Sequence, residues 1–174
     1  MELLERFHKE IVLEANFLLK MKKIKNITRD KDMNPLLMDS LPNHDIWVKG
    51  WTGSNKWLNY GIVYDSKYYN SHTFTHDLIK YIEKFEERPV LMAGFSLLKS
   101  GGKIPKHTDE QVLHEKENVW HYGLDVPENC YLIIDNKKIT EENGKLIKFD
   151  DAMIHSAVNN SNNDRMILYI KFKF

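Results

Sequence analysis

The first 88 residues alternate between helical and strand-like patterns of apolar positions. From Leu3 to Met21, apolar residues recur every three or four positions, which predicts an amphipathic helix that packs on a sheet. A polar, turn-rich stretch follows from Asn26 to His44. The segments IWVKGW and NKWLNYGIVYD are rich in aromatic and β-branched residues and predict short strands. Helical spacing returns from Thr73 to Glu87 and predicts a second helix.

From Pro89 onwards the chain is a succession of short apolar segments separated by turn residues. The separators are suited to tight turns and include Ser100-Gly101-Gly102, Asn136-Lys137-Lys138 and Asn143-Gly144. The predicted strands are PVLMAGFSLLK, VWHYGLDV, CYLIID, KLIKFD, MIHSAV and RMILYIKF. Strands at this spacing indicate a sandwich or barrel. We therefore expect one domain over residues 1–174, mainly β with flanking helices, in which residues 1–88 pack on a core formed by residues 89–174.

Composition narrows the classes of partner and of site. Lysine plus arginine and aspartate plus glutamate both total 25, so the net charge is zero and no global field favours nucleic acid. No segment has the roughly 18 uninterrupted apolar residues of a membrane span, and the N-terminus lacks the features of a signal peptide. Cys130 is the only cysteine, which excludes a multi-cysteine zinc site and fits a reducing cytoplasm. We expect a soluble, cytoplasmic protein of open oligomeric state, whose metal chemistry depends on histidines and carboxylates.

A candidate metal site comes from an H-x-D triplet and a distant histidine. His107 and Asp109 follow a glycine-rich turn, and His155 lies on a predicted strand 48 residues further on. Two imidazoles and one carboxylate on one face of an octahedral iron(II) leave positions for a 2-oxo acid and dioxygen. Residues i and i+2 of a strand point to the same face, so the triplet suits this role if a strand ends there. The competing interpretation is a chance triplet beside a structural histidine, because short motifs give false positives.

Three further residues fit a carboxylate-binding site beside this metal. Arg165 lies ten residues beyond His155, at the start of the last predicted strand, where a guanidinium can pair bidentately with a carboxylate. His121 and Ser96, on the strands after and before the triplet, are candidate additional donors. A structural role stays open for each, because buried polar side chains usually satisfy the fold.

The stretch from about Leu91 to Phe172 contains four longer motifs: GFSLLKSGGKIPKHTD, WHYGLDVPENCYLII, GKLIKFDDAMIHSAVNNS and the closing DRMILYIKF. In their order and spacing, these motifs resemble the catalytic domain of the aspartyl/asparaginyl β-hydroxylase family. It implies a double-stranded β-helix, which is a jelly-roll barrel of the cupin type. It also implies an iron(II)- and 2-oxoglutarate-dependent dioxygenase that consumes dioxygen and releases succinate and carbon dioxide.

The resemblance also implies roles for particular residues. His107 and His155 would be iron ligands, Arg165 and His121 would bind 2-oxoglutarate, and Ser96 would assist them. Asp109 departs from the animal endoplasmic reticulum members, which have glycine at the carboxylate position, whereas many bacterial relatives keep aspartate. The three-ligand set is therefore complete in this chain. The expected substrate is a small molecule or a peptide, with an aspartyl or asparaginyl residue, a free amino acid and a related metabolite all left open.

Two other functions remain as alternatives. The first is a non-catalytic cupin-like binding module, against which the complete set of His107, Asp109, His155 and Arg165 argues. The second is a cupin-type metalloenzyme that does not use 2-oxoglutarate; such sites tend to have three or four histidine or glutamate ligands and need no arginine. Four residues of the N-terminal half are candidates for a substrate pocket, with core packing as the competing role for the tryptophans: Trp51, Trp57, Asn59 and Tyr60.

Overall fold

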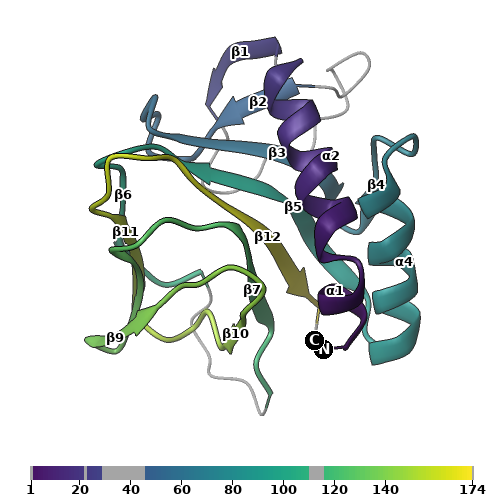
Figure 1. Ribbon diagram of the computed structural model, residues 1–174. Coiled ribbons are helices and arrows are strands. Elements are labelled where there is room, and N and C mark those ends of the chain that lie inside the picture. Colours follow the sequence, from purple (N-terminus) through teal and green to yellow (C-terminus); the bar gives the residue numbers. More distant parts are fainter. Residues whose placement is uncertain (1, 22, 29–45, 110–115, 174) are drawn as a thin grey trace.

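The computed structural model describes residues 2–21, 23–28, 46–109 and 116–173 (Figure 1). Most of the polar stretch that we predicted to form turns, from residue 29 to residue 44, lies outside these ranges. The prediction of turns is wrong for the beginning of this stretch, because Lys23–Thr28 forms a strand, β1, that pairs in parallel with the next strand. Among the described residues, no helix combines the length and the apolar character that crossing a bilayer requires.

The described strands form two sheets. The larger runs in the order β1 (Lys23–Thr28), β2 (Ile46–Lys49), β3 (Trp57–Tyr64), β5 (Val90–Leu98), β12 (Arg165–Phe172), β7 (Val119–Asp125), β10 (Leu146–Phe149), and β4 (Lys67–Tyr68) pairs with β3. The smaller runs in the order β6 (Lys103–His107), β11 (His155–Asn159), β8 (Cys130–Ile134), β9 (Lys137–Thr140). All pairings except β1 with β2 are antiparallel. The predicted double-stranded β-helix is confirmed, and strands from before residue 89 extend its larger sheet.

Strand β9 corrects one predicted turn. We expected Asn136-Lys137-Lys138 to separate two strands, but Lys137 already belongs to β9. The reversal occurs one step earlier, where Asp135 and Asn136 have φ values of 45° and 63°. Asparagine and aspartate tolerate this left-handed region better than other side chains, so two residues suffice for the turn.

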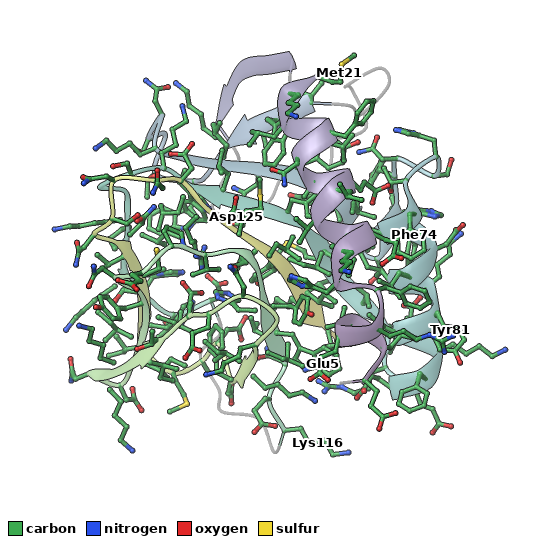
Figure 2. All side chains as sticks on the ribbon, viewed as in Figure 1. Glu5, Met21, Phe74, Tyr81, Lys116 and Asp125 are labelled. Atoms are coloured by element: carbon green, nitrogen blue, oxygen red, sulfur yellow. The ribbon has the colours of Figure 1, made fainter. Side chains whose placement is uncertain are left out.

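Helices cover the outer face of the larger sheet. The single helix predicted from Leu3 to Met21 is two helices, α1 (Glu2–Arg6) and α2 (His8–Lys20), because Phe7 leaves helical geometry. The ring of Phe7 packs instead on Phe74, at the start of α4 (Phe74–Glu86), with ring centroids 5.4 Å apart. Figure 1 shows α2 and α4 side by side on one side of the larger sheet and the smaller sheet on the other. Side chains fill the space between the layers, while Met21 and Tyr81 project from the helices into solvent (Figure 2).

The central strands of the larger sheet are buried on both faces, and alternate residues of β3, β5, β12 and β7 face different cores. One core lies between this sheet and the helices, and the other lies between the two sheets. On β12, Leu168 and Ile170 belong to the helix-side core, while Arg165, Ile167 and Tyr169 line a pocket between the sheets. The period of two along a strand produces this division. Polar residues at alternate positions of the central strands therefore point toward the space between the sheets.

Candidate metal centre and adjoining pocket

The three predicted metal ligands converge where β6 ends and β11 begins. His107 is the last residue of β6 and His155 is the first of β11, and the two are direct partners in the antiparallel ladder. Their ring centroids are 4.2 Å apart. Asp109 lies just beyond the end of β6, and its Oδ1 is 3.6 Å from His107 Nε2. One ligand atom from each of the three residues lies within 4.8 Å of the others.

Backbone carbonyls orient both imidazoles. Nδ1 of His107 lies 2.7 Å from the Pro105 carbonyl oxygen, and Nδ1 of His155 lies 2.9 Å from the Met153 carbonyl oxygen. Because a carbonyl only accepts, each Nδ1 carries the hydrogen, which leaves the Nε2 lone pair free for a metal. Burial lowers the pKa of His155 and the neighbouring His107 lowers it further, which favours the neutral ring that ligation requires. Two neutral imidazoles and a carboxylate fit iron(II).

A buried polar cluster holds the loop between β10 and β11, which carries the backbone into His155. Lys171 Nζ lies 2.6 Å from Asp151 Oδ2, and Asn118 Nδ2 donates to Asp151 Oδ1 at 2.6 Å. The Asp151 carbonyl accepts a hydrogen bond from the Asp109 backbone N–H at 3.0 Å. The cluster therefore connects the loop before His155 to the backbone of Asp109, the candidate carboxylate ligand.

The metal centre opens into a pocket between the two sheets that encloses about 540 Å³, part of it open to solvent. Ser96, His121 and Arg165 all line it, as predicted for a co-substrate site. Its remaining lining residues are Trp51, Trp57, Asn59, Ile104, His107, Asp109, Leu132, His155, Ser156, Ala157, Ile167 and Tyr169.

The four pocket candidates of the N-terminal half divide between the two faces of the sheet. Trp57 is buried in the core between the sheets and also lines the pocket, where its Nε1 donates to Ser96 Oγ at 3.0 Å. Trp57 therefore both packs in the core and lines the pocket. Trp51 and Asn59 line the pocket as well. Tyr60 does not belong with them: it is next to Asn59 on β3, so it faces the opposite side and packs in the helix-side core.

Two buried donors in this pocket lack a partner. Asn59 Nδ2 and Arg165 Nη1 have no hydrogen-bond acceptor among the described residues, although both are inaccessible to solvent. An unsatisfied buried donor is costly, and in a pocket it marks the place where a ligand's acceptor fits. A carboxylate is the acceptor that suits a guanidinium best. The residues present therefore fit a carboxylate-bearing ligand close to the metal ligands.

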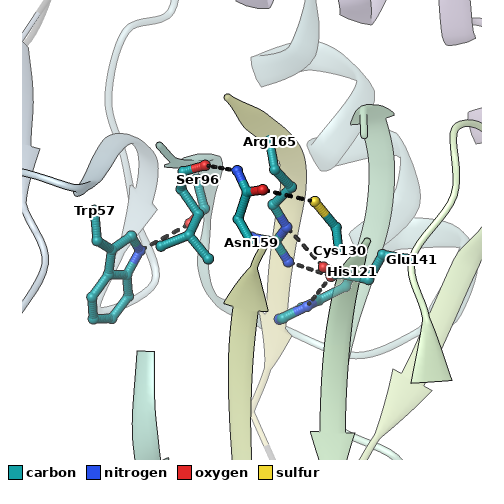
Figure 3. A network of polar contacts seen from close by, with 8 residues as sticks. Trp57, Ser96, His121, Cys130, Glu141, Asn159 and Arg165 are labelled. Carbon is teal, nitrogen blue, oxygen red and sulfur yellow. Dashed lines mark hydrogen bonds and ion pairs between the residues drawn. The ribbon is translucent and has the colours of Figure 1, made fainter. Parts of the chain in front are cut away.

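The rest of the Arg165 guanidinium is held by a residue that the sequence did not indicate. Glu141 Oε2 accepts from Arg165 Nε at 2.8 Å and Glu141 Oε1 accepts from Arg165 Nη2, while His121 Nδ1 lies 3.3 Å from Glu141 Oε1 (Figure 3). Burial alone raises the pKa of the Glu141 carboxyl, but Arg165 and His121 together bring it down to about 2. Burial is the main cause of the lowered pKa of His121, and Arg165 adds to it.

Nothing local marks Glu141 as a buried acid. It stands in the polar run TEENG just before a predicted turn, and its neighbour Glu142 is exposed at 49% of its side chain and pairs with Lys145. Glu141 itself is 4% exposed. Two adjacent glutamates look alike in the sequence. Only the tertiary structure separates them, because it brings Glu141, just after β9, to Arg165 at the start of β12.

A model of the aspartyl/asparaginyl β-hydroxylase family matches residues 52–173. The chain belongs to this family. The matched residues contain the three candidate metal ligands, Glu141 and all of the pocket's lining residues except Trp51. Among curated proteins, the uncharacterized protein L888 of Acanthamoeba polyphaga mimivirus is 29% identical over 129 residues, which are 74% of this chain and 47% of that protein. The chain thus spans about half the length of this relative.

One solved structure agrees with the double-stranded β-helix fold of this β-hydroxylase family member. An oxidoreductase of the 2OG-Fe(II) oxygenase family from Burkholderia pseudomallei superposes with a TM-score of 0.55 at 12% identity, over 68% of this chain and 69% of that one. The cupin domain of Schizosaccharomyces pombe Cnp3 is also similar, with a TM-score of 0.45 at 9% identity, over 79% of this chain and 72% of that one. At such identities the first likeness concerns the fold alone.

Proposed function

We propose that this chain is an iron(II)- and 2-oxoglutarate-dependent dioxygenase that hydroxylates an unactivated C–H bond and produces succinate and carbon dioxide. One observation carries the proposal: three side chains able to ligate a metal line the same pocket as a buried guanidinium nitrogen that has no partner among the described residues. Membership of a hydroxylase family supports it. Iron(II), with 2-oxoglutarate and dioxygen, supplies the oxidising chemistry when bound.

The protein's own residues divide the work of binding. His107 and His155 would hold the iron through Nε2, together with the Asp109 carboxylate. Arg165 would donate from Nη1 to the far carboxylate of 2-oxoglutarate in a charge-assisted hydrogen bond. Ser96, whose Oγ accepts from Trp57, has its own O–H to donate in the same pocket.

His121 would line this carboxylate site without donating to it. Its Nδ1 hydrogen is directed at Glu141, so a neutral ring presents a lone pair, not a hydrogen, at Nε2. We therefore assign the charge-assisted contacts to Arg165. Around both sites, apolar residues of the pocket such as Ile104, Leu132 and Ile167 would keep water away from the reacting centre.

The proposed substrate is a small molecule or a peptide that carries a polar carbonyl or carboxylate, such as an amino acid or an aspartyl or asparaginyl residue. Asn59 Nδ2 is a buried donor without a partner among the described residues, and it would bind that group. Trp51 would form an aromatic wall of the pocket beside the metal site, because the centroids of its ring and the His107 ring are 5.3 Å apart.

The test is to incubate purified protein with iron(II), 2-oxoglutarate and a panel of amino acids and peptides. We expect succinate to form in proportion to 2-oxoglutarate consumed, and one panel member to gain the mass of one oxygen. The His155→Ala variant is the control and should form no succinate. Oxidation of a substrate without any need for 2-oxoglutarate would instead identify a cupin-type metalloenzyme. Binding without turnover under all conditions would identify a binding module.

A further inference from the structure

Glu141 occupies one complete edge of the Arg165 guanidinium. The two carboxylate oxygens accept from Nε and Nη2, which is the side-on bidentate arrangement (Figure 3). Both residues are buried, with Arg165 at 0% and Glu141 at 4% exposure. Glu141 lies behind the arginine, outside the set of described residues that line the pocket. The edge left to a ligand is the one formed by Nη1 and the second hydrogen of Nη2.

We propose that Glu141 is a positioning residue that makes Arg165 a directional carboxylate clamp and thereby selects a 2-oxo acid with a second carboxylate. The inference rests on the proposed function. By holding Nε and Nη2, Glu141 prevents rotation of the guanidinium plane. Nη1 has no partner among the residues that the structure describes and stays oriented toward a ligand, so little side-chain ordering is needed when the ligand binds.

The charges of Glu141 and Arg165 indicate that the pair orients a ligand carboxylate and does not simply attract it. The ionised Glu141 cancels the charge of Arg165, because its pKa lies far below neutrality. An isolated guanidinium at 0% exposure would be strongly disfavoured, so the pair can be buried where the arginine alone could not. A carboxylate reaching this site meets directed N–H groups on a neutral pair. Recognition there depends on hydrogen-bond geometry and not on excess positive charge.

His121 is held by the same carboxylate. Its Nδ1 contacts Glu141 Oε1. Its ring lies edge-on to the ring of Phe149, with centroids 5.2 Å apart, and the centroid of the Tyr169 ring is 5.6 Å away. One acid therefore orients two of the residues that line the carboxylate end of the pocket. Loss of Glu141 should disturb that end and leave the metal end, which β6 and β11 build, in place.

The experiment compares two five-carbon ligands that differ only at the far end, 2-oxoglutarate and 2-oxopentanoate. The zinc-loaded protein is used because zinc has no redox chemistry, so binding occurs without turnover. Trp51 and Trp57 line the pocket, and their fluorescence reports the titration. The variants are Glu141→Gln, Glu141→Asp and, as matched control, Glu142→Gln on the exposed neighbour.

For Glu141→Gln we expect the Kd of 2-oxoglutarate to rise about tenfold or more, as for loss of an oriented charge-assisted hydrogen bond, while the Kd of 2-oxopentanoate changes less than about threefold. Glu142→Gln should match the wild type. Glu141→Asp keeps the charge but is one methylene shorter, so it should lose part of the discrimination. This variant decides the matter if the glutamine variant does not fold.

Equal or tighter 2-oxoglutarate binding by Glu141→Gln would overturn the inference, since it would mean that Glu141 only neutralises Arg165. Equal weakening of both ligands would also overturn it, because a brace for the fold acts on both alike. Unchanged discrimination in Glu141→Asp has the same consequence when only that variant folds. A wild type that fails to prefer 2-oxoglutarate over 2-oxopentanoate would contradict the proposed function itself.

Discussion

Replacing Lys171 by methionine tests whether the buried polar cluster of Lys171, Asp151 and Asn118, which holds the loop between β10 and β11, stabilises the protein. The Lys171–Asp151 ion pair is 2.6 Å long, and the two side chains are 6% and 0% exposed. Methionine removes the positive charge and keeps most of the length of the side chain. Among the described residues, the buried Asp151 carboxylate then keeps Asn118 Nδ2 as its side-chain donor.

The expected loss follows from that uncompensated charge. Removing one partner of a buried ion pair costs about 3–5 kcal/mol. Because Asn118 still donates, we expect the lower end of this range, about 3 kcal/mol in the free energy of unfolding. For a domain of this size, each kcal/mol corresponds to roughly 2–4 °C, so Tm should fall by about 6–12 °C. Asp109 is hydrogen-bonded to the Asp151 carbonyl, so bound metal should be lost more readily as well.

The assay is urea and thermal unfolding of the metal-free protein, followed by circular dichroism. Lys173→Met, two residues further on at an exposed position, is the matched control and should resemble the wild type. Adding Asp151→Asn to Lys171→Met removes the orphaned charge and should restore part of the lost stability. Two results would refute the reasoning. One is a free energy of unfolding for Lys171→Met within about 1 kcal/mol of the wild type, and the other is a double variant less stable than the single variant Lys171→Met.

Three further predictions follow from the site. His107→Ala and His155→Ala should each abolish succinate formation and lower the iron content measured after dialysis; full activity in either variant would remove that residue from the ligand set. Arg165→Ala should weaken 2-oxoglutarate binding by about 10- to 100-fold in a direct titration, and an unchanged affinity would count against the guanidinium as its partner. Glu141 has its pKa lowered from 4.5 to about 2, so its contribution to stability is present above pH 4.5 and is lost as the pH falls toward 2. Acid titration of the unfolding free energy should therefore be shallower over that range for Glu141→Gln than for wild type, and identical slopes would contradict the assignment.

The three candidate metal ligands could be picked out from the sequence because the chemistry of histidine and aspartate is recognisable one residue at a time, and the structure brings them together. An H-x-D triplet at a strand end and a later histidine on another strand are local features, and the family resemblance supplied their pairing. Ser96, His121 and Arg165 could be chosen because they stand on predicted strands around the triplet and after His155, and all three line the pocket. Period-two alternation along a strand separates residues of one face from those of the other. The same alternation explains Tyr60, which is out of phase with Asn59 and could have been assigned to the helix side.

The sequence by itself determined the β-rich class, most of the long strands and the residue types able to bind iron and a carboxylate. The tertiary structure alone decided that Glu141 faces Arg165 while Glu142 faces solvent, that β9 begins at Lys137, and that Asp151 pairs with Lys171. The physical reason is that hydrophobic periodicity reports the local backbone and the side of an element that is buried. Which buried charge meets which depends on strand order and register, and these arise from the simultaneous packing of segments far apart in the chain.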